Sequence, residues 1–313
     1  MVKKGVKILV TGGAGFIGSN LIPLLLQKGY SVTVLDNLSS GKRETLSQFE
    51  GNPDFAFLKG DIRDKTAVQK ALAGVDCIVH LAALIDVAVS IDDPTLTHDV
   101  NVTGTLGILQ EAAKSGVRRV VFASSTAVYG DTKVLPVTEE TPLKPISPYA
   151  ATKAACEAYL NAYSVSFGLE TVSLRFFNVY GPKNENSPYS GVITKFLRRA
   201  LNGEALTVEG DGEQTRDFIH VSDVARALTL ALEAENLRCE SFNVCTGVPT
   251  SINGLVDVLA KATGKTLRVE HGPARVGDIR FSYGDGSKAA QKIGFKASVN
   301  MLNGLKMLLE ATR

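Results

Sequence analysis

The chain of 313 residues is long enough for one large domain with a smaller lobe and short for three domains. Its composition, 44% hydrophobic and 21% charged residues, predicts a well-buried core, and its net charge of +2 argues against nucleic acid as the main partner. No apolar run approaches the ~20 residues of a membrane span, and no signal-peptide core precedes the first glycines. Because the four cysteines form no CxxC pair and the four histidines show no ligand spacing, we expect no metal site and a reducing, cytoplasmic location.

The first 180 or so residues alternate between short apolar runs and helical stretches. The apolar runs, rich in Val and Ile, are predicted strands at 7–10, 31–36, 55–60, 77–83, 118–125 and 170–178. The predicted helices cover 15–28, 65–73, 94–115 and 149–167. Continuous apolar strands separated by helices indicate a parallel sheet covered on both faces, the Rossmann-type doubly wound α/β fold.

The pattern changes after residue 178. The sequence predicts helices at 192–201, 217–232 and 252–262 and strands at 240–246 and 267–270. The helix at 217–232 and the strand at 240–246 are expected to return to the sheet. We therefore expect a main domain at 1–178 plus 213–247 and a smaller α/β lobe at 179–212 plus 248–313.

The first predicted strand runs into the sequence Gly12-x-x-Gly15-x-x-Gly18, which opens the first predicted helix. Glycine is needed where the backbone turns sharply, approaches a pyrophosphate and packs a helix against the sheet. The start of the helix then offers free N–H groups and a positive dipole end to the phosphates. A second strand ends at Asp36, about twenty residues on, as the dinucleotide-binding fingerprint requires.

Asp36 also indicates which dinucleotide is bound. A carboxylate at this position accepts hydrogen bonds from the adenosine ribose hydroxyls and repels a 2′-phosphate. The residues that follow, Asn37-Leu38-Ser39-Ser40, include no arginine that could neutralise such a phosphate. The sequence therefore predicts NAD rather than NADP, held by the main domain.

Tyr149 and Lys153 stand four residues apart in a predicted helix, so their side chains project from the same face. A tyrosine with a free pKa of ~10 needs a downward shift of about three units, ~4 kcal/mol, to act as a base near neutral pH. A neighbouring ammonium and the positive charge of an oxidised nicotinamide would lower the pKa. Since the pair follows a dinucleotide loop and a strand ending in Ser124-Ser125-Thr126, we interpret it as catalytic.

Further motifs accompany these residues: TGGAGFIG at 11–18, Gly60-Asp61-Ile62-Arg63, His80-Leu81-Ala82-Ala83, Asn101, and SSTxVYG at 124–130. Together with Asp36 and the Tyr149 and Lys153 pair, they resemble the extended short-chain dehydrogenase/reductase family. RFFNVYGP at 175–182 and RDFIHV at 216–221 narrow the resemblance to its nucleotide-sugar branch. The chain is most similar there to UDP-glucose 4-epimerases and UDP-N-acetylglucosamine 4-epimerases, over nearly its whole length.

The resemblance implies two sets of binding residues. Those implied to contact NAD are Gly12, Gly15, Phe16, Ile17, Gly18, Asp36, Asn37, Asp61, Ile62, Leu81, Ala82, Ala83, Asn101, Ser124, Tyr149, Lys153 and Phe176. Those implied to contact a UDP-sugar are Ser125, Tyr149, Asn178, Val192, Arg216, Arg275, Asp278 and Ser282. Asn178, Arg216 and Arg275 would hold the diphosphate, which suits the two-pronged guanidinium, and Asp278 would hold the uridine ribose.

The family resemblance also implies a first chemical step. A tyrosinate, here Tyr149, takes the proton of the sugar 4-hydroxyl while NAD takes the hydride from C4. Lys153 would lower the pKa of Tyr149 and hold the nicotinamide ribose, and Ser125 with Thr126 would hydrogen-bond near O4. In 4,6-dehydratases and UDP-glucuronate decarboxylases an acidic residue stands two before the tyrosine of the VYG motif, where this chain has Ala127. Without that carboxylate we expect C4 epimerisation, in which the 4-keto sugar turns over and the hydride returns to its other face.

One position bears on which sugar is used. Seven residues after Arg275, where glucose-restricted epimerases carry a bulky Tyr, this chain has Ser282. The segment 187–192 also lacks the paired Asn of the glucose-restricted type. We expect N-acetylated UDP-sugars to be accepted along with UDP-glucose and UDP-galactose.

Three alternatives stay open: a UDP-glucuronate 4-epimerase, an NAD(P)H-dependent 4-keto-sugar reductase, and a non-enzymatic NAD-sensing regulator on the same fold. Such regulators tend to lose the tyrosine or the lysine, and this chain has both. As in relatives, we expect a homodimer that pairs the helix carrying Tyr149 with the predicted helix at 94–115.

Overall fold

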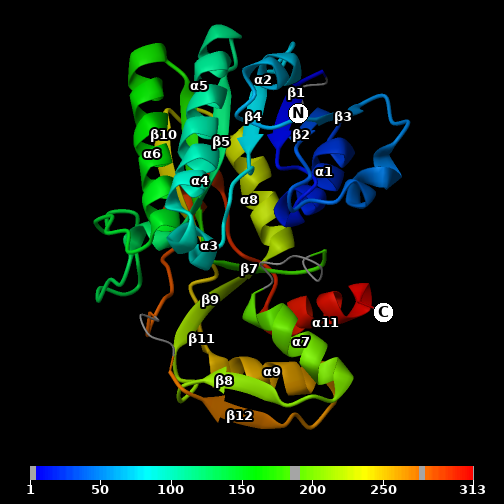
Figure 1. Ribbon diagram of the computed structural model, residues 1–313, viewed down its shortest axis with the longest axis vertical. Helices are drawn as coiled ribbons and strands as arrows, with labels where there is room; N and C mark the ends of the chain where they lie inside the picture. The colour runs from blue at the N-terminus through cyan, green and yellow to red at the C-terminus, as the bar shows by residue number, and fades with distance from the viewer. Residues whose placement is uncertain (1–4, 184–190, 275–278, 313) are drawn as a thin grey trace.

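The computed structural model describes residues 5–183, 191–274 and 279–312 and contains a seven-stranded sheet in the upper part of Figure 1. The strand order is β10-β6-β5-β4-β1-β2-β3, and every neighbouring pair is parallel. The strands are β1 (Lys7–Thr11), β2 (Ser31–Asp36), β3 (Phe55–Lys59), β4 (Cys77–His80), β5 (Arg119–Ser125), β6 (Glu170–Phe176) and β10 (Cys239–Val244). The doubly wound parallel sheet expected from the sequence is confirmed.

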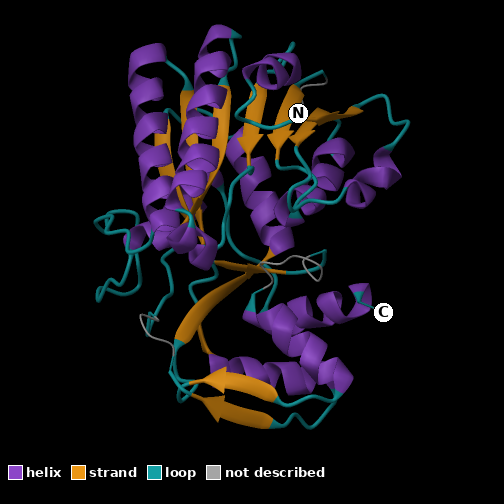
Figure 2. Ribbon diagram, viewed as in Figure 1, coloured by secondary structure: helices purple, strands orange, loops and turns teal. Residues whose placement is uncertain are grey.

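Helices cover both faces of this sheet (Figure 2). One face packs against α1 (Phe16–Gln27), α8 (Val221–Glu233) and α10 (Ser287–Ile293), and the other against α2 (Lys65–Ala71), α5 (Gly104–Lys114) and α6 (Pro148–Phe167). Successive strand residues serve opposite cores: Ile8 and Val10 pack with α1 and α8, whereas Leu9 packs with α2 and α5. This explains why the strands are apolar at consecutive positions rather than at alternate ones.

A smaller group of elements lies below the sheet in Figure 1. It contains a three-stranded sheet of β7 (Asn178–Tyr180), β9 (Thr215–His220) and β11 (Pro249–Ser251), and a pair formed by β8 (Leu206–Glu209) and β12 (Val269–Gly272). The helices α7 (Val192–Asn202), α9 (Ile252–Thr263) and α11 (Met301–Ala311) share one buried apolar cluster with these strands. The division of the chain into two lobes stays a prediction. Helix α10, which lies within the segment 248–313 assigned to the smaller lobe, packs against β10 of the large sheet.

Three expected elements differ clearly in the structure. The strand expected at 170–178 ends at Phe176, and Asn178 begins β7 of the three-stranded sheet. The segment 217–232 was expected to be helical throughout, but 217–220 belong to strand β9 and the helix begins at Val221. This stretch pairs with β7 on one side and β11 on the other, and those partners decide its conformation. The helix expected at 94–115 is divided into α4 (Pro94–His98), a π-helical turn η2 (Asp99–Thr103) and α5.

The remaining elements are short connections: η1 (Arg43–Phe49), α3 (Val87–Asp92) and η3 (Thr126–Tyr129). Strand β1 lies between β2 and β4, so the chain order along the sheet reverses there. In open parallel sheets, ligands bind in the crevice beyond the carboxyl ends of the strands at such a reversal. Among the described residues, no helix is long and apolar enough to cross a membrane, and no group of acidic, Cys and His side chains has a metal-binding arrangement.

Candidate active site

A cleft of about 870 Å³ opens where the carboxyl ends of β1, β2, β4, β5 and β6 meet. Of the residues expected to contact the cofactor, all but Asn101 line it. They are Gly12, Gly15, Phe16, Ile17, Gly18, Asp36, Asn37, Asp61, Ile62, Leu81, Ala82, Ala83, Ser124, Tyr149, Lys153 and Phe176. Ser125, Asn178 and Val192, expected on the sugar side, line the same cleft. The structure therefore brings both sets together.

The glycine loop is shaped by close backbone contacts. Gly12 has a φ of 68°, and a Cβ there would lie 2.7 Å from the backbone nitrogen of Ala82. A Cβ on Gly18 would lie 2.5 Å from the Cα of Gly13. Helix α1 begins after Gly15, which has no side chain to cap the first N–H groups. An uncapped helix start beneath a tight glycine turn fits the diphosphate of a dinucleotide.

The Asp36 carboxylate is fixed at the end of β2. Its Oδ2 accepts the N–H of Ala14 (2.9 Å) and its Oδ1 accepts the N–H of Leu38 (2.8 Å), with only 7% of the residue exposed. Burial raises the pKa of this carboxyl, while the two N–H donors lower it. Each oxygen keeps a free lone pair on the cleft side for a hydroxyl donor, as the NAD prediction requires.

A second carboxylate borders the cleft next to Asp36. Asp61 accepts two hydrogen bonds from the Arg63 guanidinium (both 2.9 Å) and one from the Asn37 amide (2.9 Å). The hydrogen bonds from Arg63 are the largest of the causes that hold the pKa of Asp61 well below its usual range. Arg63 itself lines the cleft and also binds Asp99 (2.8 Å). It was not among the predicted site residues, although it is the last letter of the motif at 60–63.

Tyr149 and Lys153 come from the first two turns of α6. Ser147 caps this helix by accepting the N–H of Ala150 (3.1 Å), and Pro148 occupies its first position. The Lys153 Nζ donates to the carbonyl of Ala123 on β5 (2.7 Å) and lies 6.0 Å from the centre of the Tyr149 ring. Both side chains are buried and face the cleft, as their spacing predicted.

Burial and hydrogen bonding both act on the protonation of this pair. Burial raises the pKa of the Tyr149 phenol, and a hydrogen bond with Ser125 opposes the rise. Burial lowers the pKa of Lys153 to about 8, so most of this ammonium is charged at pH 7. The further lowering of the Tyr149 pKa by Lys153, whose Nζ lies 6.0 Å from the centre of the phenol ring, stays a prediction. The positive charge of a bound nicotinamide is the other contribution named by the sequence argument.

Asn101 lies behind the cleft and not in its lining. Its Oδ1 accepts the N–H of Leu84 (2.7 Å), and its Nδ2 donates to the Leu84 carbonyl (2.9 Å) and to Thr152 Oγ1 (3.0 Å). With 1% of the residue exposed, these bonds use both N–H groups and one lone pair of the oxygen. Asn101 therefore reaches the cleft through Leu84, which lines it.

A buried chain of hydrogen bonds supports the same loop. The N–H of Ala82 donates to Thr11 Oγ1 (3.3 Å), which lies 2.6 Å from His80 Nδ1, and His80 Nε2 lies 2.9 Å from Thr105 Oγ1. Since Thr105 donates its own proton to the Asn101 carbonyl (2.5 Å), the His80 proton sits on Nε2. Burial lowers the pKa of His80 to about 3, so this ring is neutral.

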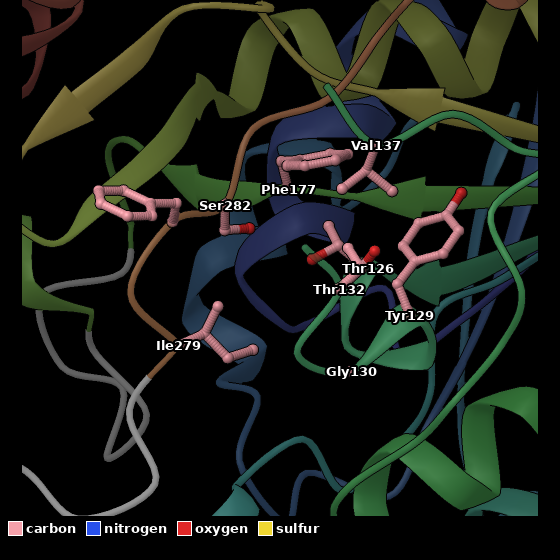
Figure 3. A pocket seen from close by; sticks show the side chains of 9 residues that line it. Thr126, Tyr129, Gly130, Thr132, Val137, Phe177, Ile279 and Ser282 are labelled. Atoms are coloured by element: carbon pink, nitrogen blue, oxygen red, sulfur yellow. The ribbon is translucent and has the colours of Figure 1, made fainter. Parts of the chain in front are cut away.

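Thr126 and Ser282 line a separate small hollow of about 20 Å³. Figure 3 shows Ser282 and Ile279 on one side of it and Thr126 and Tyr129 on the other. Phe177 lines both this hollow and the large cleft, so the two are neighbours. Thr126 thus lines the same hollow as Ser282 and is not part of the lining of the large cleft.

The predicted diphosphate and ribose contacts are only partly described. Arg275 and Asp278 lie outside the described residues. Arg216 does not line the cleft; its guanidinium donates to the carbonyls of Thr215 (2.8 Å) and Ile279 (2.7 Å). It thereby holds the segment that leads to Ser282.

A lysine that the sequence argument passed over does line the cleft. Lys183 directly follows the 175–182 motif and donates from Nζ to the Ser19 carbonyl of α1 (2.8 Å). Asn20, also on α1, donates to the Pro182 carbonyl (3.1 Å). The segment after β7 is therefore tied to the helix that carries the glycine loop.

Comparisons with known proteins agree with this geometry. Residues 8–245 match the profile of the NAD dependent epimerase/dehydratase family. The chain is similar to a UDP-glucose 4-epimerase of Mycolicibacterium smegmatis, with 39% identity covering 98% of each chain. Two solved structures are each 38% identical. A UDP-glucose 4-epimerase of Thermotoga maritima with UDP-glucose has a TM-score of 0.92 and covers 98% of both chains.

The second structure is a UDP-N-acetylglucosamine 4-epimerase of Methanobrevibacter ruminantium in complex with UDP-N-acetylmuramic acid, with a TM-score of 0.93 and 99% of both chains covered. The match therefore extends over the large sheet and the smaller group of elements below it alike. Identity at this level, over this length, shows common descent as well as common fold. The chain belongs to the NAD-dependent epimerase/dehydratase family.

Proposed function

We propose that this chain is an NAD-dependent UDP-hexose 4-epimerase that interconverts UDP-glucose and UDP-galactose. The observation that carries the proposal is the convergence of the glycine loop, Tyr149 and Lys153 on one cleft. Relatives that match almost the full length of the chain bear the name UDP-glucose 4-epimerase, which supports the same activity.

The residues of the cleft fit NAD and divide its binding among them. The glycine loop and the start of α1 would hold the diphosphate, Asp36 the adenosine ribose, and Asp61 with Ile62 the adenine. Lys153 has two N–H groups beyond its bond to Ala123, and these would hold the nicotinamide ribose. When bound, the nicotinamide would accept the C4 hydride of the sugar and return it.

Tyr149 would act as the base that removes the proton from the sugar O4 and later gives it back. Ser125 favours the phenolate by hydrogen bonding to it, and the Lys153 ammonium lies beyond the ring. The O4 proton thus moves to the Tyr149 oxygen as the C–O bond becomes a ketone. Once the 4-keto sugar has presented its other face, the same oxygen returns the proton and the C4 configuration is inverted.

Ala127 supports epimerisation over dehydration or decarboxylation, because it gives the 4-keto sugar no carboxylic acid for chemistry at C5 or C6. A 4-keto-sugar reductase would use the same pair but would consume reduced cofactor. A glucuronate 4-epimerase would need a group for the C6 carboxylate, and a sensing regulator would show no turnover.

A second sugar series is supported by the hollow beside Ser282. The small serine leaves an open space of about 20 Å³ next to Phe177. We propose that this space admits part of a 2-acetamido group, so that UDP-GlcNAc and UDP-GalNAc are also interconverted. The solved UDP-N-acetylglucosamine 4-epimerase of similar fold agrees with this proposal.

We also propose that the protein is a cytoplasmic homodimer. Helix α6 exposes three large apolar side chains, with Tyr159 39%, Val165 79% and Phe167 63% exposed. Side chains of this kind on a long helix fit a helical partner. The family resemblance supplies that partner, the same helices of a second copy.

The test is turnover on a panel of UDP-galactose, UDP-GlcNAc and UDP-glucuronate, with products separated by chromatography. Wild-type protein is expected to convert UDP-galactose without added NADH, and Tyr149→Phe should lower kcat by about 10²–10⁴-fold because the proton acceptor is removed. Tyr163→Phe, on the same helix outside the cleft, is the matched control and should retain full activity. A fully active Tyr149→Phe variant would overturn the mechanism, and a need for stoichiometric NADH would favour the reductase.

A further inference from the structure

Helix α6 turns a third polar side chain toward the end of β5, one turn beyond the catalytic pair. Tyr149, Lys153 and Glu157 are spaced four residues apart, and all three are buried. Lys153 donates to the Ala123 carbonyl, and Glu157 accepts the hydroxyl proton of Ser124 (2.5 Å). Consecutive residues of β5 are therefore held by consecutive turns of α6.

Glu157 is paired with an equally buried cation. Arg175 donates to it from Nε (3.0 Å) and from Nη2 (2.6 Å), and both side chains are only 7% exposed. Arg175 lies on β6 directly opposite Ser124 of β5 in the sheet register. The Glu157 carboxylate thus accepts hydrogen bonds from Ser124 of β5 and from Arg175 of β6, two residues that are neighbours in the sheet.

The Arg175 guanidinium also contacts Tyr129. It donates to Tyr129 Oη (2.9 Å) and lies 4.9 Å from the centre of the Tyr129 ring. Tyr129 then donates to Asn243 Oδ1 on β10 (2.7 Å). The pair is therefore fixed between α6, β6 and β10, and the side chains have little freedom to relax.

Such a pair is not explained by stability alone. Desolvating two charges costs about as much as their attraction returns, so a buried ion pair is often no better than apolar residues of the same size. What distinguishes this pair is its place, one helical turn from Lys153 and in contact with Ser124, both of which line the cleft. The Ser124 proton is committed to Glu157, so the Ser124 hydroxyl can take part in further hydrogen bonds only as an acceptor.

The charged and titratable groups around Lys153 are few. Glu157 and Cys156 from α6 interact with it electrostatically, and so does His80 from β4, which is neutral. Tyr149 is one turn back on the same helix, and β5 contributes only the Ala123 carbonyl and the Phe122 ring. Arg175 reaches the lysine only through Glu157. Glu157 is thus the one permanent charge among these neighbours.

We propose that Glu157 and Arg175 form a positioning pair for the active site, in which Glu157 keeps Lys153 charged and Ser124 oriented while Arg175 keeps Glu157 ionised and in place. The proposal deepens the proposed epimerase function and rests on it for the kinetic consequence. Neither residue is a catalytic residue, because neither touches the cleft.

The first test measures the proton affinity of Lys153 directly, without turnover. Lysine labelled with carbon-13 at Cε is titrated by NMR, and the Lys153 signal is identified by its loss in Lys153→Met. Glu157→Gln should lower the pKa of Lys153 by about one unit, the order expected for a charge one helical turn away. Arg175→Gln should lower it in the same direction, because Glu157 then loses the donors that keep it ionised and in place. Since Arg175 acts on the lysine only through Glu157, the double variant should shift the pKa no further than Glu157→Gln does.

A matched control comes from the far end of the same two strands. Glu170 on β6 accepts from Arg119 on β5 (2.8 Å), an ion pair remote from the cleft. Glu170→Gln should cost comparable stability without moving the pKa of Lys153. An unchanged Lys153 pKa in Glu157→Gln, or a shift of the same size in Glu170→Gln, would show that the pair is merely structural and would overturn the proposal.

The second test uses the pH dependence of kcat. In Glu157→Gln, kcat should fall about twofold at pH 7 and about tenfold at pH 9, with KM little changed, because the alkaline limb moves to lower pH by about one unit. Unshifted limbs in a folded Glu157→Gln variant would contradict the proposal. If wild-type protein shows no epimerase activity at all, the proposed function fails, while the NMR titration still decides whether the pair sets the charge of Lys153.

Discussion

At position 282 a serine borders a hollow that a larger side chain would fill. Ile279 stands on the same side, while Thr126 and Tyr129 stand opposite (Figure 3). The hollow measures about 20 Å³, so the ring of a tyrosine would fill it completely and extend beyond it. The side chain at this one position therefore sets how much of the space beside Phe177 a ligand can use.

Ser282→Tyr is expected to abolish turnover of UDP-GlcNAc while leaving that of UDP-galactose within a few-fold of wild type. The reason is steric, because the phenol ring would occupy the space assigned to the acetamido group. Parallel assays of kcat/KM with both substrates measure the ratio, and Ser282→Ala should preserve it. Equal losses with both sugars would mean that the hollow does not discriminate between them.

Single residues were predicted well where a motif carries them and poorly where only spatial contact does. The glycines, Asp36, Tyr149 and Lys153 occur at spacings that chemistry requires, and all of them line the cleft. Glu157 was not predicted, because its partner on β6 is eighteen residues away in sequence. A polar residue on a helix gives no sign of burial until the strand opposite it is known.

Between elements, the neutral His80 joins β1, β4 and the helical segment η2–α5 beneath the cleft. The bonds run from Thr11 through the imidazole to Thr105 and from there to the Asn101 carbonyl. The sequence gives no sign of this link, because η2 is a π turn within what reads as one continuous helix. Such turns are frequent at functional sites. The same limit applies to β9, where pairing with β7 and β11 overrides the local pattern.

The His80 link makes stability depend on pH in a known direction. Burial holds the pKa of His80 at about 3, below the ~6.5 of an unfolded chain. Between these two pKa values His80 is protonated in the unfolded state but not in the folded state. The contribution of the neutral His80 to the free energy of unfolding is therefore complete above about pH 6.5 and is lost as pH falls. The loss should amount to about 1.4 kcal/mol per pH unit in that window.

Urea unfolding of wild-type protein and His80→Gln at pH 5, 6 and 7 measures this contribution. The amide of Gln can still bond to the two threonines but does not titrate, so the variant should lose stability less steeply on acidification. The plots of unfolding free energy against pH should differ in slope by an amount that corresponds to about one bound proton. Parallel pH dependences would mean that His80 is protonated in the folded protein.

On the scale of the whole molecule, the exposed apolar side chains of α6 bear on assembly. The dimer proposed above would bury Tyr159 against a second copy, whereas the large sheet itself is already covered on both faces. The fold class could be predicted because the alternation of strands and helices determines it. Assembly could not, since an exposed apolar face has the same sequence pattern as a buried one.

Light scattering after gel filtration should give twice the 33.3 kDa of one chain. Tyr159→Glu, which would bury a charge in the interface, should shift the mass toward the monomer. Met307→Glu is the matched control, because Met307 is exposed to a similar degree (42%) on α11 and lies away from α6. A monomeric wild-type protein, or a dimer indifferent to Tyr159→Glu, would contradict the proposed interface.

The two hydrogen bonds between α1 and the segment after β7 have a thermodynamic consequence. Asn20 and Lys183 join the helix of the glycine loop to a stretch of chain that borders the sugar side of the cleft. Coupling between two binding sites is reciprocal: if the sugar nucleotide raises the affinity for NAD by some factor, NAD raises the affinity for the sugar nucleotide by the same factor. A sugar nucleotide that favours this arrangement would slow the dissociation of NAD while the sugar is bound. Dissociation at that stage would leave the 4-keto sugar without the cofactor that returns its hydride.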